Sequence, residues 1–370
     1  MLYPRYNPPE DLQVLDHQNE DHVKQAMLLI QSAFGEHLDR KHWEWKYATS
    51  PAGKSLNLLM FKEGRVAGHW AYSPVRYKLG HEEQIGYICT DIAVDRKVFG
   101  RKEAALRLLR LGKSGYHLID ANGGVLGSGY PNTNSLFLGV KRLGWGPLLS
   151  VTNLACFLRL EPFLRTKFSN RLLVRLVGWV WRAVVSVGIW ARLIDLWPSW
   201  GRRVHRAHAF DDRATLLWEN VSATMGNAVV RDKEYLNWRY CSPLRSVYDV
   251  FIAERKGELI GYIVLRIKTN EKGVKEALIA DLIAKDHNPF IASRLIISAL
   301  RFAIRSRCDV VRAWSSKHSP YLLYLRAAGF MKRKSIINLV LRPYSPNPEI
   351  AEQVIKTSRW HVMMGDSDSV

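Results

Sequence analysis

The chain has 370 residues, of which 47% are hydrophobic and 24% charged, as in an ordinary soluble globular protein of two domains. Its net charge of +20 predicts an acidic partner or surface, such as nucleic acid, anionic lipid or a phosphorylated ligand. The four cysteines stand apart, without a C-x-x-C pair or a paired histidine, and the first residues lack the apolar core of a signal peptide. These features argue against a metal site and predict a cytoplasmic protein with reduced thiols.

The first 160 residues alternate between helical and extended patterns. Apolar residues between Val23 and Phe34 have the spacing of an amphipathic helix, and Glu63-Gly64 is a turn between two strands. In chain order we predict a strand at Leu12–Leu15, helices at Val23–Phe34 and Trp43–Tyr47, strands at Leu56–Phe61, Val66–Tyr77 and Ile85–Val94, a helix at Arg101–Lys113, a strand near Gly127–Tyr130, a helix from near Asn134 to Gly144, and a strand at Leu149–Leu158.

Residues 163–200 form a segment of different composition. They hold five of the thirteen tryptophans, and residues 159–206 contain ten lysines or arginines against two acidic residues. Arg182 interrupts the apolar stretches, which are shorter than the ~20 residues of a membrane span. On a helical wheel Arg171, Arg175 and Arg182 fall within about 40° of each other, beside an apolar face rich in tryptophan. This pattern is typical of a helix lying in a membrane interface, and it fits equally an interdomain helix packed on one of the domains.

The remainder of the chain repeats the plan of the first 160 residues. In chain order we predict helices at Ala214–Val221 and Asp232–Tyr240, strands at Tyr248–Ala253, Leu259–Ile267 and Ala277–Ile283, a helix at Pro289–Ser306, a strand at Asp309–Trp314, a helix at Pro320–Ala328 and a strand at Ile336–Leu341. Helices that flank a mixed sheet predict an α/β (α+β) architecture.

Short motifs support the repeat directly. Trp45-Lys46-Tyr47 and Trp238-Arg239-Tyr240 lie 193 positions apart. The same order of residues continues with Thr90-Asp91-Ile92-Ala93 against Ala280-Asp281-Leu282-Ile283, and then, at an offset of 185, with a glycine followed by an aromatic residue. A spacing this long predicts two whole domains of one fold rather than a solenoid.

The stretch from Thr90 to Leu106 carries the clearest functional motif. A predicted strand ends in Ala93-Val94, a loop follows, and a helix begins near Gly100. The amides at a helix N-terminus suit a pyrophosphate, glycine permits close approach of the backbone, and the basic pair Arg101-Lys102 adds positive charge. This stretch resembles the acyl-CoA-binding signature of the GNAT acyltransferase superfamily. The chain outside residues 163–200 resembles the tandem GNAT proteins of bacterial exopolysaccharide gene clusters.

The resemblance implies two GNAT-like domains, at residues 1–160 and 207–370, joined by a Trp-rich basic helical linker at residues 161–206. The second copy of the loop, Lys285–Phe290, has no glycine, so we expect the second domain to be degenerate and acyl-CoA to bind the first. The positions implied for acyl-CoA binding are Ala93, Val94, Phe99, Gly100, Arg101, Lys102, Glu103, Ala104, Asn132 and Asn134.

The catalytic groups are less well defined by the sequence. The resemblance implies that a backbone N–H around Ala93–Val94 stabilises the thioester oxygen as it gains charge. The candidates for the general base are Asp91, His69 and His117, and Asp91 is favoured because the repeat mirrors it. The tyrosine that serves the family as general acid is replaced by Val140 in the first copy and by leucine in the second.

Together these features predict an acyl-CoA-dependent, and more specifically acetyl-CoA-dependent, N- or O-acyltransferase. We expect its acceptor to be a sugar or lipid-linked glycan precursor of polysaccharide biosynthesis, and residues 163–200 to dock the cytoplasmic enzyme at the anionic inner face of the membrane. Because Phe99 replaces the family's Arg or Gln, a non-catalytic tandem-GNAT scaffold or regulator is the alternative. A nucleic-acid-binding protein is third, and no nucleic acid is expected because the tryptophans cluster on the linker instead of alternating with basic residues.

Overall fold

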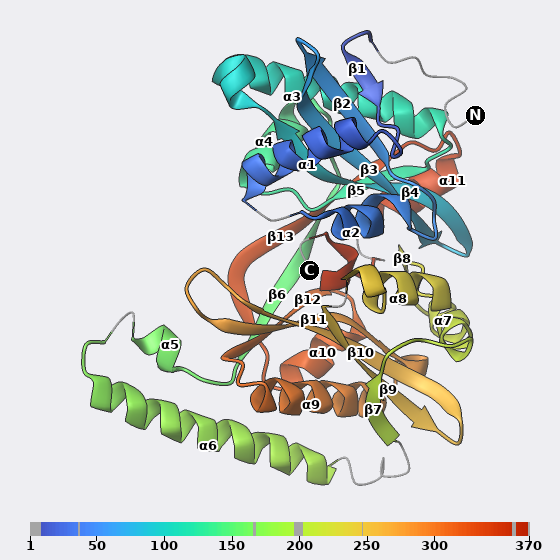
Figure 1. The fold of residues 1–370 in the computed structure, drawn as a ribbon. Helices are drawn as coiled ribbons and strands as arrows, with labels where there is room; N and C mark the ends of the chain where they lie inside the picture. The colour runs from blue at the N-terminus through green and yellow to red at the C-terminus, as the bar shows by residue number, and fades with distance from the viewer. Residues whose placement is uncertain are drawn as a thin grey trace.

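The computed structural model describes residues 9–35, 38–165, 168–195, 203–245, 247–356 and 360–368. Figure 1 shows two lobes, one above the other, with the C-terminal residues between them and helix α6 along the lower edge. The upper lobe is built mainly by the first unit and the lower lobe by the second.

The first unit contains the elements expected from its hydrophobic pattern. The helix expected from Arg101 starts there, after a break at Gly100, and one additional turn precedes it from Arg96. Asp95 caps this turn by accepting a hydrogen bond from the amide of Lys97. The elements are β1 (Leu12–Val14), α1 (Glu20–Phe34), α2 (Arg40–Trp43), a π-helical turn (Glu44–Ala48), β2 (Leu56–Lys62), β3 (Arg65–Leu79), β4 (Glu82–Val94), α3 (Arg96–Ala121), β5 (Leu126–Gly129), α4 (Thr133–Arg142) and β6 (Leu148–Phe157).

The second unit follows the same order. Three short elements went unpredicted, namely β7, β8 and α11. The two strands are too short to show a hydrophobic period. The elements are β7 (Arg203–Ala207), α7 (Arg213–Ser222), β8 (Ala228–Val229), α8 (Lys233–Tyr240), β9 (Tyr248–Arg255), β10 (Glu258–Thr269), β11 (Lys275–Ala284), α9 (Pro289–Arg305), β12 (Val310–Ser316), α10 (Pro320–Ala327), β13 (Met331–Pro343) and α11 (Pro348–Ile355).

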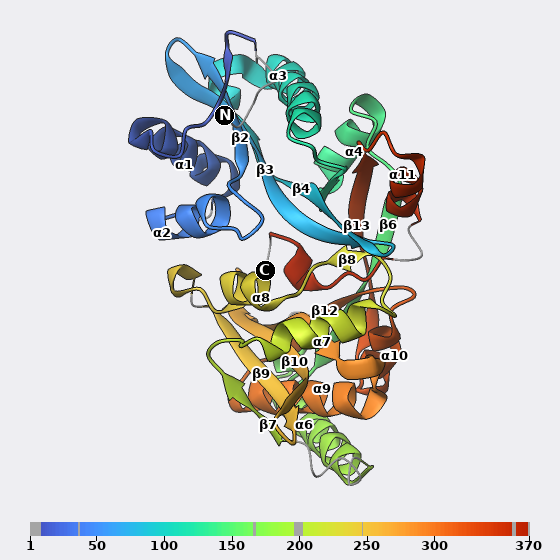
Figure 2. The ribbon, with the colours of Figure 1, turned by 90° about the vertical axis from the view of Figure 1, so that its right-hand side faces the viewer.

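A single mixed sheet runs through both lobes. Its strands follow the order β1-β2-β3-β4-β5-β13-β6-β12-β11-β10-β9-β7. The pairs β4–β5 and β11–β12 are parallel, and β6 and β13 lie antiparallel at the centre. Figure 2 shows these two central strands passing side by side from one lobe to the other.

The two units exchange their last strands. In chain order β6 completes the first unit, yet it pairs with β12 of the second. In the same way β13 ends the second unit's sheet but pairs with β5 of the first. The main hydrophobic core is therefore shared: it includes Leu126 and Leu149 of the first unit together with Ile263 and Leu341 of the second. The domain boundaries at residues 160 and 207 stay a prediction, because β6 and β13 each pair with a strand of the other unit.

The repeated Trp-basic-Tyr motifs meet each other between the lobes. The Trp45 and Trp238 rings are stacked, with centroids 5.4 Å apart and planes 17° from parallel. Each indole N–H donates to the backbone carbonyl of the other tryptophan, at 2.7 Å from Trp45 and 2.9 Å from Trp238. Equivalent residues of the two repeats thus form one symmetric contact.

The linker contains helix α5 (Glu161–Leu164) and the 25-residue helix α6 (Arg171–Asp195). The Trp181 indole donates to the carbonyl of Phe157 at 2.9 Å, which fixes α6 to the end of β6. Trp197 and Trp200 lie outside the described residues, as does the side chain of Trp190. Among the helices that the structure describes, none is both long and apolar enough to span a membrane.

Candidate functional site

Strand β4 separates from β5 halfway along its length. The parallel register joins only Gly86–Ile88 to Leu126–Ser128, so residues 89–94 of β4 continue beyond the end of the pairing. A β-bulge interrupts the pairing of β4 with β3 in the same stretch, where Asp91 takes a positive φ of 48°. The two strands therefore diverge beside the expected acyl-CoA loop, and we call this divergence the notch.

The loop that follows β4 has the expected geometry of an anion site. Gly100 interrupts α3 with φ 70° and ψ 166°, a region that essentially only glycine occupies, and a Cβ built on it meets no atom within 4 Å. A new helical segment starts after Gly100, so its first amides lack carbonyl partners one turn earlier. Arg101 and Lys102 are exposed at this helix start, whereas Ala104 is buried against the core.

The remaining residues expected around acyl-CoA lie in and near this loop. Ala93 and Phe99 are buried, and the Phe99 ring packs under the cationic groups of Lys62 and Arg107, 5.2 and 5.3 Å from its centroid. Val94 and Glu103 are half-buried. Phe99 thus takes an internal packing position.

The two expected asparagines belong to the start of α4. Asn132 is the N-cap of α4, and its side-chain oxygen accepts from the amide of Ser135 at 3.0 Å. Asn134 is in the first turn, and its side chain lies outside the described residues. Asn132 is exposed, so its amide group faces outward while its oxygen caps the helix.

The second unit closes the equivalent notch. Strand β11 pairs with β12 only over Glu276–Ile279, but the hydroxyl of Tyr321 accepts from the amide of Ala284 at 3.0 Å and is fully buried in the splay. The amides at the start of α9 are capped by Asn288, and the first helical residue, Pro289, has no N–H. The second unit therefore offers no free helix start to a phosphate.

A buried polar cluster surrounds the bulge of β4. Lys46 forms an ion pair with the Asp91 carboxylate, and the Tyr47 hydroxyl donates to the same carboxylate. His69 Nδ1 lies 2.8 Å from the carbonyl of Asp91, and its Nε2 lies 3.1 Å from the amide nitrogen of Asn57. Since a carbonyl only accepts, the proton sits on Nδ1 and Nε2 accepts from Asn57.

The protonation of this cluster follows from burial and charge. Burial alone would raise the pKa of Asp91, but the Lys46 ammonium and the hydrogen bonds from Lys46 and Tyr47 outweigh it and hold the pKa below its usual value. Burial lowers the pKa of His69 to about 4, so the ring is neutral at pH 7. Asp91 is consequently an ionised carboxylate that holds Lys46 in place.

A cleft of about 550 Å³ of empty space lies between the lobes beside this cluster. Ile88 and Thr90 of β4 face it from the first unit, and the tail residues Gly365–Asp368 line it from the other end of the chain. Other lining residues are Trp45, Lys46, Ser73, Pro74, Val75, Tyr77, Val229, Tyr235, Trp238 and Arg239. The cleft combines aromatic side chains with basic and acidic groups.

Two acidic residues line this cleft, Asp366 and Asp368, and Asp368 lies beside Lys46. Its carboxylate lies 3.6 Å from Lys46 Nζ, and a third of its side-chain surface is exposed. Burial raises the pKa of Asp368, the Lys46 ammonium lowers it, and the Asp91 carboxylate raises it further, so the pKa lies above its usual value. A carboxylate with a raised pKa beside an open cleft has the properties of a general base.

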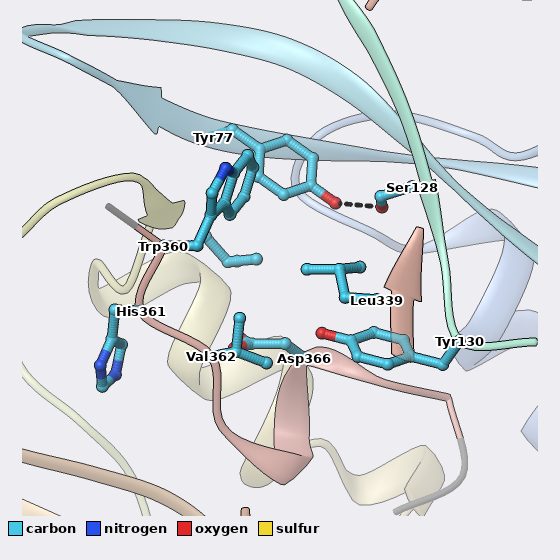
Figure 3. A pocket seen from close by; sticks show the side chains of 9 residues that line it. Tyr77, Ser128, Tyr130, Leu339, Trp360, His361, Val362 and Asp366 are labelled. Carbon is cyan, nitrogen blue, oxygen red and sulfur yellow. Dashed lines mark hydrogen bonds between the residues drawn. The ribbon is translucent and has the colours of Figure 1, made fainter. Parts of the chain in front are cut away.

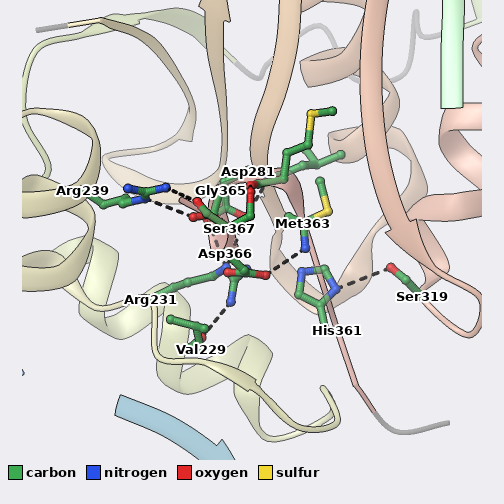
Figure 4. A network of polar contacts seen from close by, with 12 residues as sticks. Val229, Arg231, Arg239, Asp281, Ser319, His361, Met363, Gly365, Asp366 and Ser367 are labelled. Carbon is green, nitrogen blue, oxygen red and sulfur yellow. Dashed lines mark hydrogen bonds and ion pairs between the residues drawn. The ribbon is translucent and has the colours of Figure 1, made fainter. Parts of the chain in front are cut away.

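A second network holds the tail in place. Arg231 is fully buried and bridges Asp281, at 3.0 Å, and Asp366, at 2.8 Å. Arg239 donates to the carbonyls of Gly365 and Ser367. Figure 4 shows these tail residues among the two arginines. Asp281, the repeat partner of Asp91, is thus also an ion-paired carboxylate.

A smaller cavity of about 250 Å³ adjoins the cleft, and the two share Tyr77, Val229 and Asp366. Figure 3 shows the Tyr77 hydroxyl bonded to Ser128, at 2.7 Å, and Tyr130 projecting from the end of β5 toward Asp366. Burial raises the pKa of Tyr130 well above its ordinary value, so its hydroxyl stays protonated at neutral pH. This cavity extends the space between the lobes toward the end of β5.

The structure brings Asp91 and His69 together and places His117 on the exposed side of α3. Sequence reasoning missed the roles of Lys46 and Asp368 as site residues. Lys46 lies inside the repeated motif, which is the signal that could have identified it. The described residues contain no group of three or more His, Cys, Asp or Glu side chains able to hold a metal ion.

No protein-family model and no curated protein sequence matches the chain. Solved structures do match it. N-myristoyltransferase of Saccharomyces cerevisiae with bound myristoyl-CoA has a TM-score of 0.60 at 11% identity, covering 93% of this chain and 85% of that one. A tandem GNAT protein from the clavulanic acid biosynthesis pathway has a TM-score of 0.56 at 11% identity, covering 91% and 99%. A GCN5-related N-acetyltransferase from Anabaena variabilis has a TM-score of 0.57 at 12% identity, covering 90% and 72%.

These likenesses establish the fold. The chain has a mixed α/β fold like that of the GNAT acyltransferases, and the tandem GNAT protein matches it over nearly the whole length of both chains. The fold class expected from the sequence is confirmed.

Proposed function

We propose that the chain is an acyl-CoA-dependent acyltransferase in which the first unit binds the acyl-CoA and the cleft between the lobes binds the acceptor. The observation that carries the proposal is the inequality of the two notches. In the first, the strands diverge and a helix restarts at Gly100. In the second, the Tyr321 hydroxyl accepts from the amide of Ala284, and Asn288 caps the first amides of the helix. Of the two notches, only the first leaves helix-start amides and exposed basic side chains for a pyrophosphate.

The proposed chemistry is a direct transfer. An amine or hydroxyl of the acceptor attacks the thioester carbonyl, the C–S bond breaks, and the CoA thiolate leaves. Asp368 takes the proton of the attacking group, because its pKa is raised and it faces the cleft. Lys46 fixes the position of Asp368, while Asp91 is committed to Lys46 and Tyr47.

For the acceptor we propose a sugar or lipid-linked glycan precursor, with acetyl-CoA as the donor and polysaccharide biosynthesis at the cytoplasmic face of the membrane as the setting. The half-buried Trp238 lines the cleft and offers an aromatic surface that suits the apolar face of a sugar ring. Ser73, Thr90 and Asp368 supply hydroxyl and carboxylate groups around it. Such a mixture of aromatic surface and a few convergent polar groups favours a small polar ligand.

The test compares Gly100, at the break in α3, with Gly123, in the turn that follows α3. Gly100 and Gly123 both have positive φ, near 70°, and neither has an atom within 4 Å of a Cβ. Acetyl-CoA at 100 times its Kd should stabilise the wild-type chain by about 2.7 kcal/mol in thermal unfolding. Gly100→Glu should abolish this stabilisation, because a carboxylate enters the phosphate loop, and Gly123→Glu should keep it.

Activity is then measured as acetyl-CoA-dependent thiol release with amino sugars and lipid-linked sugars. Release with the wild-type chain and the Gly123 variant, but not the Gly100 variant, supports the proposal. Acetyl-CoA stabilisation without release for any acceptor would favour the scaffold alternative. Equal stabilisation of both variants would refute the assignment of the site to Gly100.

A further inference from the structure

Helix α6 exposes a continuous apolar face. Leu172, Leu176 and Trp179 have 76%, 60% and 63% of their surface exposed. At 100° per residue, the exposed apolar side chains span about 160° of the helix circumference. They are Leu172, Leu173, Leu176, Val177, Trp179, Val180, Ala183, Val184 and Val187. A face of this size is rarely left to water in a soluble protein.

The opposite side of α6 packs against α5 and contacts α9 of the second unit, so the exposed face has a set direction. Val174 is buried, and Gly178 packs so closely on Glu161 that a Cβ would lie 2.4 Å from its carboxyl carbon. Arg182 pairs with Glu161 at 3.3 Å. In both views α6 runs along the outer edge of the lower lobe, with its far side away from the remainder of the chain (Figures 1 and 2).

Basic side chains flank this apolar face. Arg171 and Arg175 are exposed, and they share with Arg182 a stripe about 40° wide beside the edge that carries Trp179. The chain as a whole has a net charge of +20. An apolar face with an arginine stripe at its edge complements the interface of a membrane that contains acidic lipids. There the apolar side chains contact acyl chains, and the arginines contact anionic headgroups.

We propose that α6 docks the protein on an anionic membrane, lying in the plane of the interface with its apolar face among the upper acyl chains. The helix is about 37 Å long, and it does not reach the hydropathy of a spanning helix. A second copy of the chain is the less favourable occupant, because pairing two such helices would bring arginine stripes of like charge together. This inference stands on α6 alone and does not depend on the proposed acyltransferase activity.

The test measures co-sedimentation of the full-length protein with vesicles of phosphatidylcholine containing 30% phosphatidylglycerol. We expect binding that falls by about 100-fold or more in the triple variant Leu172→Ser, Leu176→Ser, Trp179→Ser, because each buried side chain contributes roughly ten-fold. The matched control is Leu216→Ser with Leu323→Ser, which removes two similarly exposed leucines from α7 and α10 and should bind as wild type. All five side chains are exposed, so thermal unfolding should be unchanged.

The charge requirement is tested separately. Arg171→Gln with Arg175→Gln should weaken binding about 20-fold, since each arginine near an anionic surface contributes roughly five-fold, and 0.5 M salt should have a similar effect. Absence of sedimentation, or equal sedimentation with pure phosphatidylcholine, would overturn the proposal. A dimer in light scattering that the triple variant dissociates, without vesicle binding, would assign the face to a second copy instead.

Discussion

The contact between the repeated motifs leads to a quantitative prediction. Trp45 is almost completely buried, and replacing it with alanine removes the stacked ring, one indole hydrogen bond and the contacts of Arg239 and Arg245 with its face, 5.1 and 4.3 Å from the centroid. Truncation of a buried tryptophan costs about 3–5 kcal/mol in the free energy of unfolding. The carbonyl of Trp238, which loses its donor, contributes to this cost.

A double-mutant cycle separates the contact from the cost of truncation. Trp45→Ala and Trp238→Ala each remove one indole N–H, but the backbone carbonyl of the substituted residue remains, so the two hydrogen bonds are lost independently. The stacking of the two rings is the one interaction that both single substitutions remove. It therefore appears as a coupling energy, which we expect to be about 1–2 kcal/mol. The double variant should therefore be less unstable than the sum of the two single variants.

The assay is urea-induced unfolding of the full-length chain, followed by far-ultraviolet circular dichroism because tryptophan emission changes with the substitutions. The control cycle pairs Trp45→Ala with Trp218→Ala, a buried tryptophan of α7 in the core of the second unit. That cycle should be additive within about 0.5 kcal/mol. Additivity of the Trp45–Trp238 cycle within the same margin would refute the view that the two repeats stabilise each other through this pair.

Three other predictions follow from the polar groups. Asp368→Asn should lower kcat/KM by about 100-fold or more without changing acetyl-CoA affinity, and an unchanged kcat/KM would exclude Asp368 as the base. Arg231→Met should lower the free energy of unfolding by about 3–5 kcal/mol in urea titrations, because it leaves Asp281 and Asp366 buried without a counter-charge; a loss below 1 kcal/mol would contradict this. The pKa of His69 is about 4 in the folded chain and 6.5 in the unfolded chain. Its contribution to the free energy of unfolding, roughly 3 kcal/mol, is therefore complete above pH 6.5 and is lost as the pH falls toward 4. His69→Gln should flatten this part of the stability–pH profile, and an equally steep profile would show that other groups cause it.

The fold was largely predictable because its elements are long and strongly patterned. The motif around Trp45 and its copy at Trp238 identified two equivalent units, and runs of apolar and β-branched residues located strands such as β10 and β11. The exchange of β6 and β13 was not predictable, since the sequence of a strand does not specify which sheet edge it pairs with. A repeat also does not indicate whether its equivalent residues contact each other. The contact between Trp45 and Trp238 is therefore known only from the structure.

The candidate site was predictable in part. Gly100 is visible in the sequence because its position after a strand demands a special backbone conformation, and the structure gives it a positive φ. Asp91 was singled out by symmetry with Asp281, and both carboxylates prove to be ion-paired. Asp368 was not identified, because a residue near the end of the chain reaches the site only through the buried contacts of Arg231 and Arg239 with the tail.

The strand exchange also governs when the protein can fold during its synthesis. The edge of β5 is completed by β13, which leaves the ribosome about 200 residues later, or roughly 10–40 s later at about 5–20 residues per second. During that interval the upper lobe has an open sheet edge at β5, and such edges are templates for aggregation. A chain that ends before residue 331 lacks β13, so the edge of β5 stays uncovered. The first unit therefore needs the last strand of the second unit to complete its sheet.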